Sequence, residues 1–232
     1  MTEDDPTALA AGVRPQTFGR ARPERVDRPV VEPQWLGLRV IVAAAESGAA
    51  MFDAGAPLEG HERILSRLTA MIARTADGVI LDGYLTKQLS TDDLPARILT
   101  DSVPTAAQLM TKPFIGIRRN RAEERIRRLD AEEAARVFAD HDIVNLVLTD
   151  LLWLDGEWLL GVPLLERKRL LEAVIPGDDL VRAGPYVLPP YERWIGSWRA
   201  QGFNGMTFKA ANSRYRPGEP SDDWARSDLP RR

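Results

Sequence analysis

Apolar and β-branched residues gather in short runs along the chain, and these runs predict β-strands. The first run holds two strands separated by a short irregular break, and the others each hold one. The run over residues 143–154 is mainly apolar, which is typical of a buried strand. The predicted strand regions are residues 30–45, 79–85, 143–154, 180–187 and 206–211.

Three other stretches, 61–78, 163–174 and 191–202, repeat apolar residues at helical spacing. Gly78 is the expected end of the first helix, and Pro163 suits the first turn of the second because that turn needs no backbone N–H from it. The third helix carries an aromatic stripe, which we expect to face the core. Its members are Tyr191, Trp194, Ile195 and Trp198.

The remaining segments limit the domain organisation. Residues 1–28 are rich in proline, arginine and acidic residues without apolar periodicity, so they are predicted to form a flexible arm. One α+β domain, with antiparallel sheets flanked by helices, is expected over residues 29–227, followed by a tail over 228–232. Residues 86–142 give no clear pattern.

Composition excludes several classes of protein. The chain has no cysteine, which rules out disulfides, thiolate metal sites and cysteine nucleophiles. Its two histidines, His61 and His141, are too far apart for metal-site spacing, so no metal site is predicted. No apolar run approaches the ~20 residues of a membrane helix, and no signal peptide is visible. A cytoplasmic protein without membrane contact is therefore expected.

Charge bears on nucleic-acid binding. The net charge is -3, whereas dedicated nucleic-acid binders are usually basic, so DNA binding would require a local basic patch. The candidates lie between residues 118 and 129, where arginines outnumber acids: Arg118, Arg119, Arg121 and Arg125. A solvated helix face with internal Glu–Arg pairs explains the same segment equally well.

Three phrases near the C-terminus are informative by their order and spacing. They are Val147-Leu-Thr-Asp-Leu-Leu-Trp-Leu-Asp-Gly156, Gly202-Phe-Asn-Gly-Met-Thr-Phe-Lys209 and Tyr215-Arg-Pro-Gly-Glu-Pro-Ser-Asp-Asp-Trp224. Together with Gly161-Val-Pro-Leu-Leu-Glu-Arg-Lys-Arg169, they resemble the last motifs of the nucleotidyltransferase (adenylation) domain of ATP-dependent DNA ligases. The resemblance implies the DNA ligase and mRNA-capping type of nucleotidyltransferase fold, which is ATP-grasp-like.

The nucleophile of that family is missing from this sequence. The family motif Glu-Pro-Lys-Trp-Asp-Gly-x-Arg supplies a lysine that attacks the α-phosphorus of ATP. Here the matching stretch is Glu32-Pro-Gln-Trp-Leu-Gly-Leu-Arg39, with Gln34 at the lysine position and Leu36 at the aspartate position. A glutamine amide is not a nucleophile, so the resemblance does not carry the chemistry with it.

Other functional positions of the family differ too. Tyr84 stands where the family has the glutamate of Asp-Gly-Glu, Thr149 where it has the adenine-stacking phenylalanine, and Asn204 where it has a metal-associated glutamate. Arg226 and Asp228 occupy the positions of two triphosphate-contacting lysines. The Ser-Arg-Asn-Gly phrase is represented at best by residues 52–55, which lack the arginine.

The letters that match the family are mainly turn formers, strand residues and packing aromatics. They are Gly37, Asp82, Gly83, Asp150, Trp153, Gly205, Tyr215, Pro217, Gly218 and Trp224. The OB-fold domain that follows these motifs in ligases is not expected here, because the sequence stops after the last motif. A folded protein that has lost catalysis is therefore predicted.

Three interpretations remain open. In the first, the chain is an inactive pseudo-ligase that binds DNA, a nucleotide or a repair protein in bacterial DNA repair or recombination. In the second, another lysine takes over adenylation: Lys209, or less well Lys112. In the third, Tyr84 and Leu36 plug the old nucleotide site of an interaction protein.

No cofactor is assigned by these interpretations. ATP and Mg²⁺ are expected only if nucleotide binding survives, and the residues that would then contact the nucleotide are Arg39, Thr149, Lys209 and Arg226. The oligomeric state is not predicted.

Overall fold

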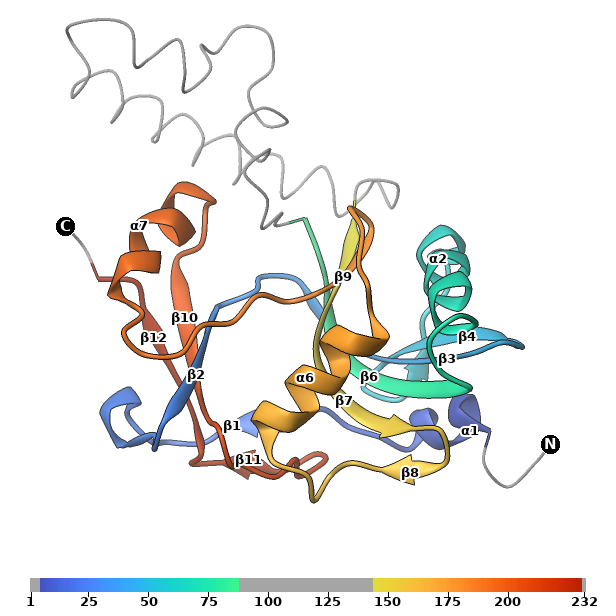
Figure 1. The fold of residues 1–232 in the computed structure, drawn as a ribbon, viewed down its shortest axis with the longest axis horizontal. Helices are drawn as coiled ribbons and strands as arrows, with labels where there is room; N and C mark the ends of the chain where they lie inside the picture. Colours follow the sequence, from blue (N-terminus) through green and yellow to red (C-terminus); the bar gives the residue numbers. More distant parts are fainter. Residues whose placement is uncertain (1–4, 88–143, 231–232) are drawn as a thin grey trace, which may run out of the picture.

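The computed structural model describes residues 5–87 and 144–230, and their strands form two main β-sheets (Figure 1). The larger sheet has the order β5-β4-β3-β6-β7-β8, with β9 also paired to β7. Its neighbours are antiparallel except for β7 and β9, which are parallel. The strands are β3 (Leu38–Ala45), β4 (Gly48–Asp53), β5 (Ala56–Pro57), β6 (Gly78–Thr86), β7 (Asn145–Leu154), β8 (Glu157–Trp158) and β9 (Val181–Ala183).

The smaller sheet is antiparallel and has the order β12-β10-β2. Its strands are β2 (Pro29–Pro33), β10 (Gly205–Ala210) and β12 (Trp224–Asp228). A third, two-stranded parallel sheet joins the start of the chain to its end through β1 (Thr17–Phe18) and β11 (Pro220–Ser221). Strands far apart in the sequence therefore meet in both smaller sheets.

Helices cover the sheets. In Figure 1, α2 and α1 lie on opposite sides of the larger sheet, and α7 lies beside the smaller one. The helical segments are α1 (Pro6–Ala11), the 3-10 turn η1 (Pro23–Arg25), α2 (Glu62–Ile72), α6 (Leu164–Val174) and α7 (Glu192–Ala200). This arrangement confirms the predicted α+β class with antiparallel sheets flanked by helices, and the described residues form no OB-fold.

Strand β3 shows why the larger sheet is buried on both faces. Its side chains alternate, so Val40 and Val42 pack with α2 in one hydrophobic cluster. Ile41 and Ala43 point the other way, into a cluster that contains residues of α1. This two-sided burial explains the continuous apolar runs in the sequence.

The helix predicted after residue 61 is present as α2, and its apolar stripe faces the first cluster. The expected end at Gly78 is wrong, since α2 is capped at Ala73 and Gly78 begins β6. A Cβ at residue 78 would press on the ring of Trp153, so this glycine serves close packing between β6 and β7.

The aromatic stripe of α7 is only partly core. Trp198 is 3% exposed and packs in the cluster beneath the smaller sheet, whereas Trp194 is 38% exposed. Tyr191 and Ile195 are half-buried against the same cluster. The prediction that the whole stripe faces the core is therefore wrong for Trp194, because a single short helix presents only part of its circumference to one sheet.

Residues 1–28 were predicted to form a flexible arm, and this is wrong for the described part, from residue 5 onward. Asp5 caps α1 by accepting from Thr7 N, and Ala10 and Val13 are buried in the cluster behind the larger sheet. The β1–β11 pairing then fixes the next residues. Small apolar residues without periodicity form this contact, which is why the sequence pattern did not reveal it.

The expected tail over 228–232 is also shortened. Asp228 ends strand β12, and the backbone N–H of Leu229 donates to the carbonyl of Asn204. The Leu229 side chain is buried in the cluster beneath the smaller sheet. The apolar contact of Leu229 therefore extends the ordered fold beyond Trp224 and into the expected tail.

Candidate functional site

The register of the smaller sheet places the sequence-predicted residues in rows on one face. Lys209 is paired with Trp224, and the next row joins Thr207 to Glu32 and Arg226. Directly paired residues point to the same face, and so do residues two apart on one strand. The inner face of this sheet therefore runs from Lys209 and Trp224 at one end to Gly205, Asp228 and Gln34 at the other.

The larger sheet contributes a second polar face. Arg39 on β3 is paired with Tyr84 on β6, and Asp82 on β6 is paired with Asp150 on β7. Register shifts between residues 80 and 83 mark a β-bulge next to Asp82. Bulges re-aim side chains, and here both carboxylates are fully buried.

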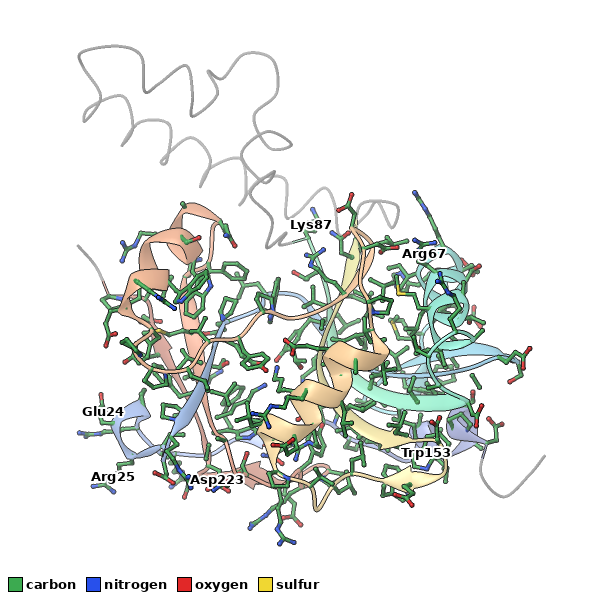
Figure 2. All side chains as sticks on the ribbon, viewed as in Figure 1. Glu24, Arg25, Arg67, Lys87, Trp153 and Asp223 are labelled. Atoms are coloured by element: carbon green, nitrogen blue, oxygen red, sulfur yellow. The ribbon has the colours of Figure 1, made fainter. Side chains whose placement is uncertain are left out.

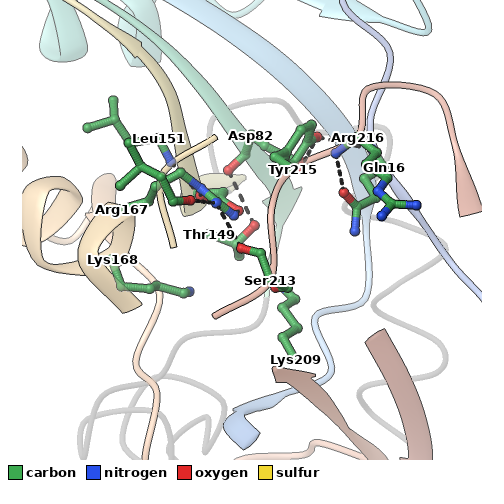
Figure 3. Close-up of polar contacts among 12 residues, drawn as sticks. Gln16, Asp82, Thr149, Leu151, Arg167, Lys168, Lys209, Ser213, Tyr215 and Arg216 are labelled. Atoms are coloured by element: carbon green, nitrogen blue, oxygen red, sulfur yellow. Dashed lines mark hydrogen bonds and ion pairs between the residues drawn. The ribbon is translucent and has the colours of Figure 1, made fainter. Parts of the chain in front are cut away.

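The buried carboxylate of Asp82 forms an ion pair with the half-buried guanidinium of Arg39. Arg39 Nε donates to Asp82 Oδ1 at 2.9 Å, and Nη2 donates to Oδ2 at 2.5 Å. The Tyr215 hydroxyl donates to Asp82 Oδ2 at 2.7 Å (Figure 3). Burial alone would lower the pKa of Arg39, but the charge and hydrogen bonds of Asp82 outweigh it and raise this pKa. Burial and the Asp82 carboxylate raise the pKa of Tyr215 well above its usual value.

The N-terminal segment completes this cluster through Gln16, which is fully buried. Its backbone N–H donates to the Tyr215 hydroxyl, and its carbonyl accepts from Arg39 Nη1. Its side-chain oxygen accepts from the backbone N–H of Arg216, as Figure 3 shows. The segment predicted as an arm is therefore part of the site.

Asp150 and Arg167 form a second ion pair, and both side chains are entirely buried. Nε and Nη2 of Arg167 donate to the two carboxylate oxygens at 2.8 and 2.9 Å. Arg167 Nη1 also donates to the carbonyls of Val162 and Ser213. This fork-to-fork geometry ties α6 to β7 and satisfies a charge that has no access to water.

The third buried ionic group is a carboxylate shared by two lysines. Glu32 on β2 pairs with Lys168 of α6 through one oxygen and with Lys209 of β10 through the other, at 2.6 Å. Burial lowers the pKa of Lys209, and burial together with the charge of Lys209 lowers the pKa of Lys168 well below its usual value. One carboxylate thus balances two cations whose charged forms are disfavoured by burial.

Trp224 brings the two faces together. The guanidinium of Arg39 lies 5.8 Å from its ring centroid, and the ammonium of Lys209 lies 4.6 Å from it. Arg39 belongs to the larger sheet and Lys209 to the smaller one. We call the residues of this region the central polar network: Gln16, Glu32, Arg39, Asp82, Asp150, Arg167, Lys168, Lys209, Tyr215 and Trp224.

Among the predicted nucleotide-binding residues, Arg39 and Lys209 lie within the network, and Thr149 lies beside it. Thr149 is buried, and its hydroxyl donates to the carbonyl of Asp82 at 3.3 Å. Arg226 is exposed on β12 and does not take part in the network contacts. The structure therefore gathers three of the four predicted residues.

Several positions that depart from the family motifs are half-buried or exposed. Gln34 is half-buried, and its side-chain oxygen lies against Gly205, where a Cβ would collide with it. Asn204 and Asp228 are exposed. Tyr84 is half-buried, packs against the cluster beneath the smaller sheet and lies under the Arg39 guanidinium.

Leu36 does not plug the site. It is 48% exposed in the loop between β2 and β3, and its carbonyl accepts a hydrogen bond from the Thr86 hydroxyl at 2.5 Å. The plug predicted from Leu36 is therefore wrong, since the loop turns this side chain toward solvent. The DNA-binding candidates Arg118, Arg119, Arg121 and Arg125 lie outside the described residues, as does Lys112.

The residues of this region do not supply the ligands that Mg²⁺ and ATP would need. Within the described residues, no group of three or more His, Asp or Glu side chains could hold a metal ion. Tyr84 and Asn204 replace carboxylates, and the buried lysines neutralise Glu32 rather than a phosphate. This residue set does not fit a metal-bound triphosphate.

Sequence reasoning did not single out four residues of the central polar network: Glu32, Arg167, Lys168 and Gln16. Arg167 and Lys168 had a signal, because two adjacent cations share the side of α6 that carries the buried Leu164 and Leu171. Cations on an apolar helix face require buried partners. Gln16 had no such signal, since its role depends on the fold of the whole segment.

The match of a family model places the chain among known proteins. Residues 28–227 match the model described as "ATP dependent DNA ligase domain". No curated protein matches the chain. In the described residues no helix is long and apolar enough to span a membrane.

Solved structures of ligases share the fold. The ligase domain of M. tuberculosis LigD matches with a TM-score of 0.59 and 20% identity, covering 94% of this chain and 60% of that one. A mycobacterial DNA ligase D complexed with ATP and MES matches with a TM-score of 0.61 and 18% identity, over the same shares. The ATP-dependent DNA ligase from bacteriophage T7, in complex with ATP, gives 0.51 and 13%, covering 95% of this chain and 69% of that one.

This chain thus spans about 60% of the length of the first two ligase structures. Because the family model covers residues 28–227, the chain belongs to the ATP-dependent DNA ligase domain family and has its nucleotidyltransferase fold.

Proposed function

We propose that this domain does not form a lysyl-adenylate and acts as a non-catalytic, nucleic-acid-binding accessory module in DNA repair or recombination. The observation that carries the proposal is the residue at the nucleophile position. Gln34 offers an amide, whose nitrogen lone pair is delocalised into the carbonyl, so it cannot attack a phosphorus atom.

The residues at three other functional positions of the family support the same conclusion. Tyr84 and Asn204 hold no charge with which to support a metal ion, and Asp228 places a carboxylate where the family has a triphosphate-contacting lysine. Catalysis of phosphoryl transfer depends on neutralising phosphate charge. A carboxylate at this position opposes that requirement.

Binding of nucleic acid is the part of the family's activity that needs no nucleophile. The similar structures are DNA ligases by their titles, and backbone binding requires only suitably placed cations. With a net charge of -3, this chain would bind through a local surface and with strong dependence on salt.

Adenylation of Lys209 is the second candidate function. Its lowered pKa favours the neutral amine that a nucleophile needs. Against it, the amine is buried, pairs with Glu32 and lies over the Trp224 ring. An attack on ATP would require Lys209 to leave both partners.

Intact-protein mass after incubation with ATP and Mg²⁺ or Mn²⁺ tests these alternatives. The ligase domain of M. tuberculosis LigD serves as the positive control, and Lys209→Ala is the matched variant. We expect no added AMP on the wild-type chain. An AMP adduct that Lys209→Ala abolishes would replace the proposal with a relocated nucleophile, and an adduct that remains in that variant would point to another residue.

A further inference from the structure

A groove on the outer surface lies away from the central polar network. One cavity, of about 650 Å³, is lined by residues of α2 and by residues 178–180. A second cavity, of about 370 Å³, continues from it and shares Arg67 and Ala70 in its lining. We call this surface the α2 groove: one wall is the exposed face of α2, and the other is the segment 176–180 that precedes β9.

Three arginines follow the α2 wall of this groove. Arg63 and Arg67 are four residues apart on one face of α2, and Arg74 lies in the turn that follows the helix, where it lines the second cavity. The residues between them, Ser66 and Ala70, are small and exposed, so the guanidiniums flank an open floor.

One of these arginines is held in place by the opposite wall. Arg67 Nε pairs with Asp178, which also accepts from the backbone N–H groups of Leu180 and Val181. Burial would raise the pKa of Asp178, but these hydrogen bonds and Arg67 lower it. Asp179 is the other acid of the lining.

Arg63 and Arg74 have no ion-pair partner within residues 5–87 and 144–230, and both are exposed. Among the described residues, the α2 groove therefore presents two guanidiniums without an ion-pair partner, those of Arg63 and Arg74, and the ion pair of Arg67 with Asp178. Such a surface is complementary to a polyanion with regularly spaced charges.

We infer that the α2 groove binds the sugar–phosphate backbone of a nucleic acid, with Arg63 and Arg74 as the phosphate contacts. An acidic peptide fits less well, because a stable interface with a protein partner is usually centred on large aromatic side chains in well-packed pockets. The groove lining contains no aromatic residue. Contacts to phosphate carry no sequence information, so binding through these arginines to the backbone is independent of sequence. This inference rests on the proposed nucleic-acid-binding function.

The first test compares two double variants of the full chain. Arg63→Gln with Arg74→Gln removes the groove contacts, while Arg22→Gln with Arg25→Gln removes the same charge from the exposed η1 region. Figure 2 shows Arg25 and Arg67 near opposite ends of the molecule. Affinity for a fluorescent 20-base-pair DNA duplex is measured by anisotropy across a salt series.

We expect the groove variant to bind roughly tenfold more weakly at low salt, with the slope of log affinity against log salt reduced by about 2. The η1 variant should keep the wild-type slope. Equal losses in both variants, or no loss in the groove variant, would overturn the groove inference while leaving DNA binding intact. Failure of the wild-type chain to bind DNA would overturn the proposed function as well.

A second measurement uses the absence of cysteine in the chain. Ser66→Cys places one thiol on the groove floor, and Ser197→Cys places one on the exposed surface of α7. Bound duplex should slow maleimide labelling of the first variant and not of the second. Equal labelling rates would contradict the groove. Polyglutamate that protects the Ser66→Cys thiol as well as DNA does would instead assign the groove to acidic proteins.

Discussion

The buried and the open ends of the inner face of the smaller sheet have diverged differently from the family motifs. At the buried end, Lys209 and Trp224 match the family and make ionic, hydrogen-bond or ring contacts. At the open end, Gln34 and Asp228 differ from it, and they are half-buried and exposed, respectively. On this face, therefore, Lys209 and Trp224 match the family and are buried, whereas Gln34 and Asp228 depart from it and are not buried.

The physical reason lies in the cost of an unpaired buried charge. Removing one member of a buried ion pair leaves the other in a medium that solvates it poorly, whereas an exposed residue can change with little effect. Asp150 and Glu32 are therefore constrained by stability, whether or not the domain is catalytic. Gln34 is not.

The largest expected effect belongs to the Asp150–Arg167 pair. Asp150→Asn keeps the shape but leaves the fully buried guanidinium of Arg167 without a counter-charge, so we expect the free energy of unfolding to fall by about 3–5 kcal/mol. Urea denaturation followed by circular dichroism measures this. Arg169→Gln, which removes an exposed pair with Glu166, is the control and should change stability by less than about 1 kcal/mol. A comparable change in both would contradict the distinction between buried and exposed ion pairs.

A smaller effect with a distinctive pH dependence is expected for Glu32→Gln. Two buried lysines then lose their shared carboxylate, so we expect a loss of about 2–4 kcal/mol at pH 7. Burial already lowers the pKa values of both lysines in the folded protein. We expect loss of the neighbouring carboxylate to lower them further.

Between the folded pKa and the ordinary lysine pKa of about 10.5, the unfolded chain binds more protons than the folded one. The unfolding free energy of Glu32→Gln should therefore rise toward the wild-type value as the pH increases from 7 to 9.5. Urea denaturation at several pH values measures this recovery. A deficit that stays constant with pH would show that the lysines are not the cause.

The smallest stability effect is expected for Gln34→Lys, which restores the family's nucleophile letter at a half-buried position. The free energy of unfolding should change by less than about 1 kcal/mol. We also expect no AMP adduct in intact mass spectrometry with ATP and Mg²⁺, because Tyr84, Asn204 and Asp228 still lack the charges that the reaction needs. Adenylation of this variant would show that Gln34 alone separates the chain from activity.

Much of the fold was predictable because local patterns encode it. The apolar runs indicated β3, β6, β7 and β9 of the larger sheet but not β4, β5 or β8, and the stripe beginning at Ile64 indicated α2. The pairing of β2 with β10 was not predictable in this way, since it joins residues more than 170 positions apart. The N-terminal segment was misjudged because proline-rich and charged sequences are usually solvated, whereas here Ala10, Val13 and Gln16 are buried.

The same distinction between local sequence and long-range contacts applies to the candidate site. The sequence alone determined that the chain has ligase motifs, that Gln34 replaces the nucleophile and that only four lysines are available. Only the tertiary structure decided that Glu32 is shared by Lys168 and Lys209, that Gln16 joins Arg39 to Tyr215, and that Leu36 faces solvent. Residue identity fixes which chemistry is available, but burial and charge pairing depend on which distant segments the fold brings together.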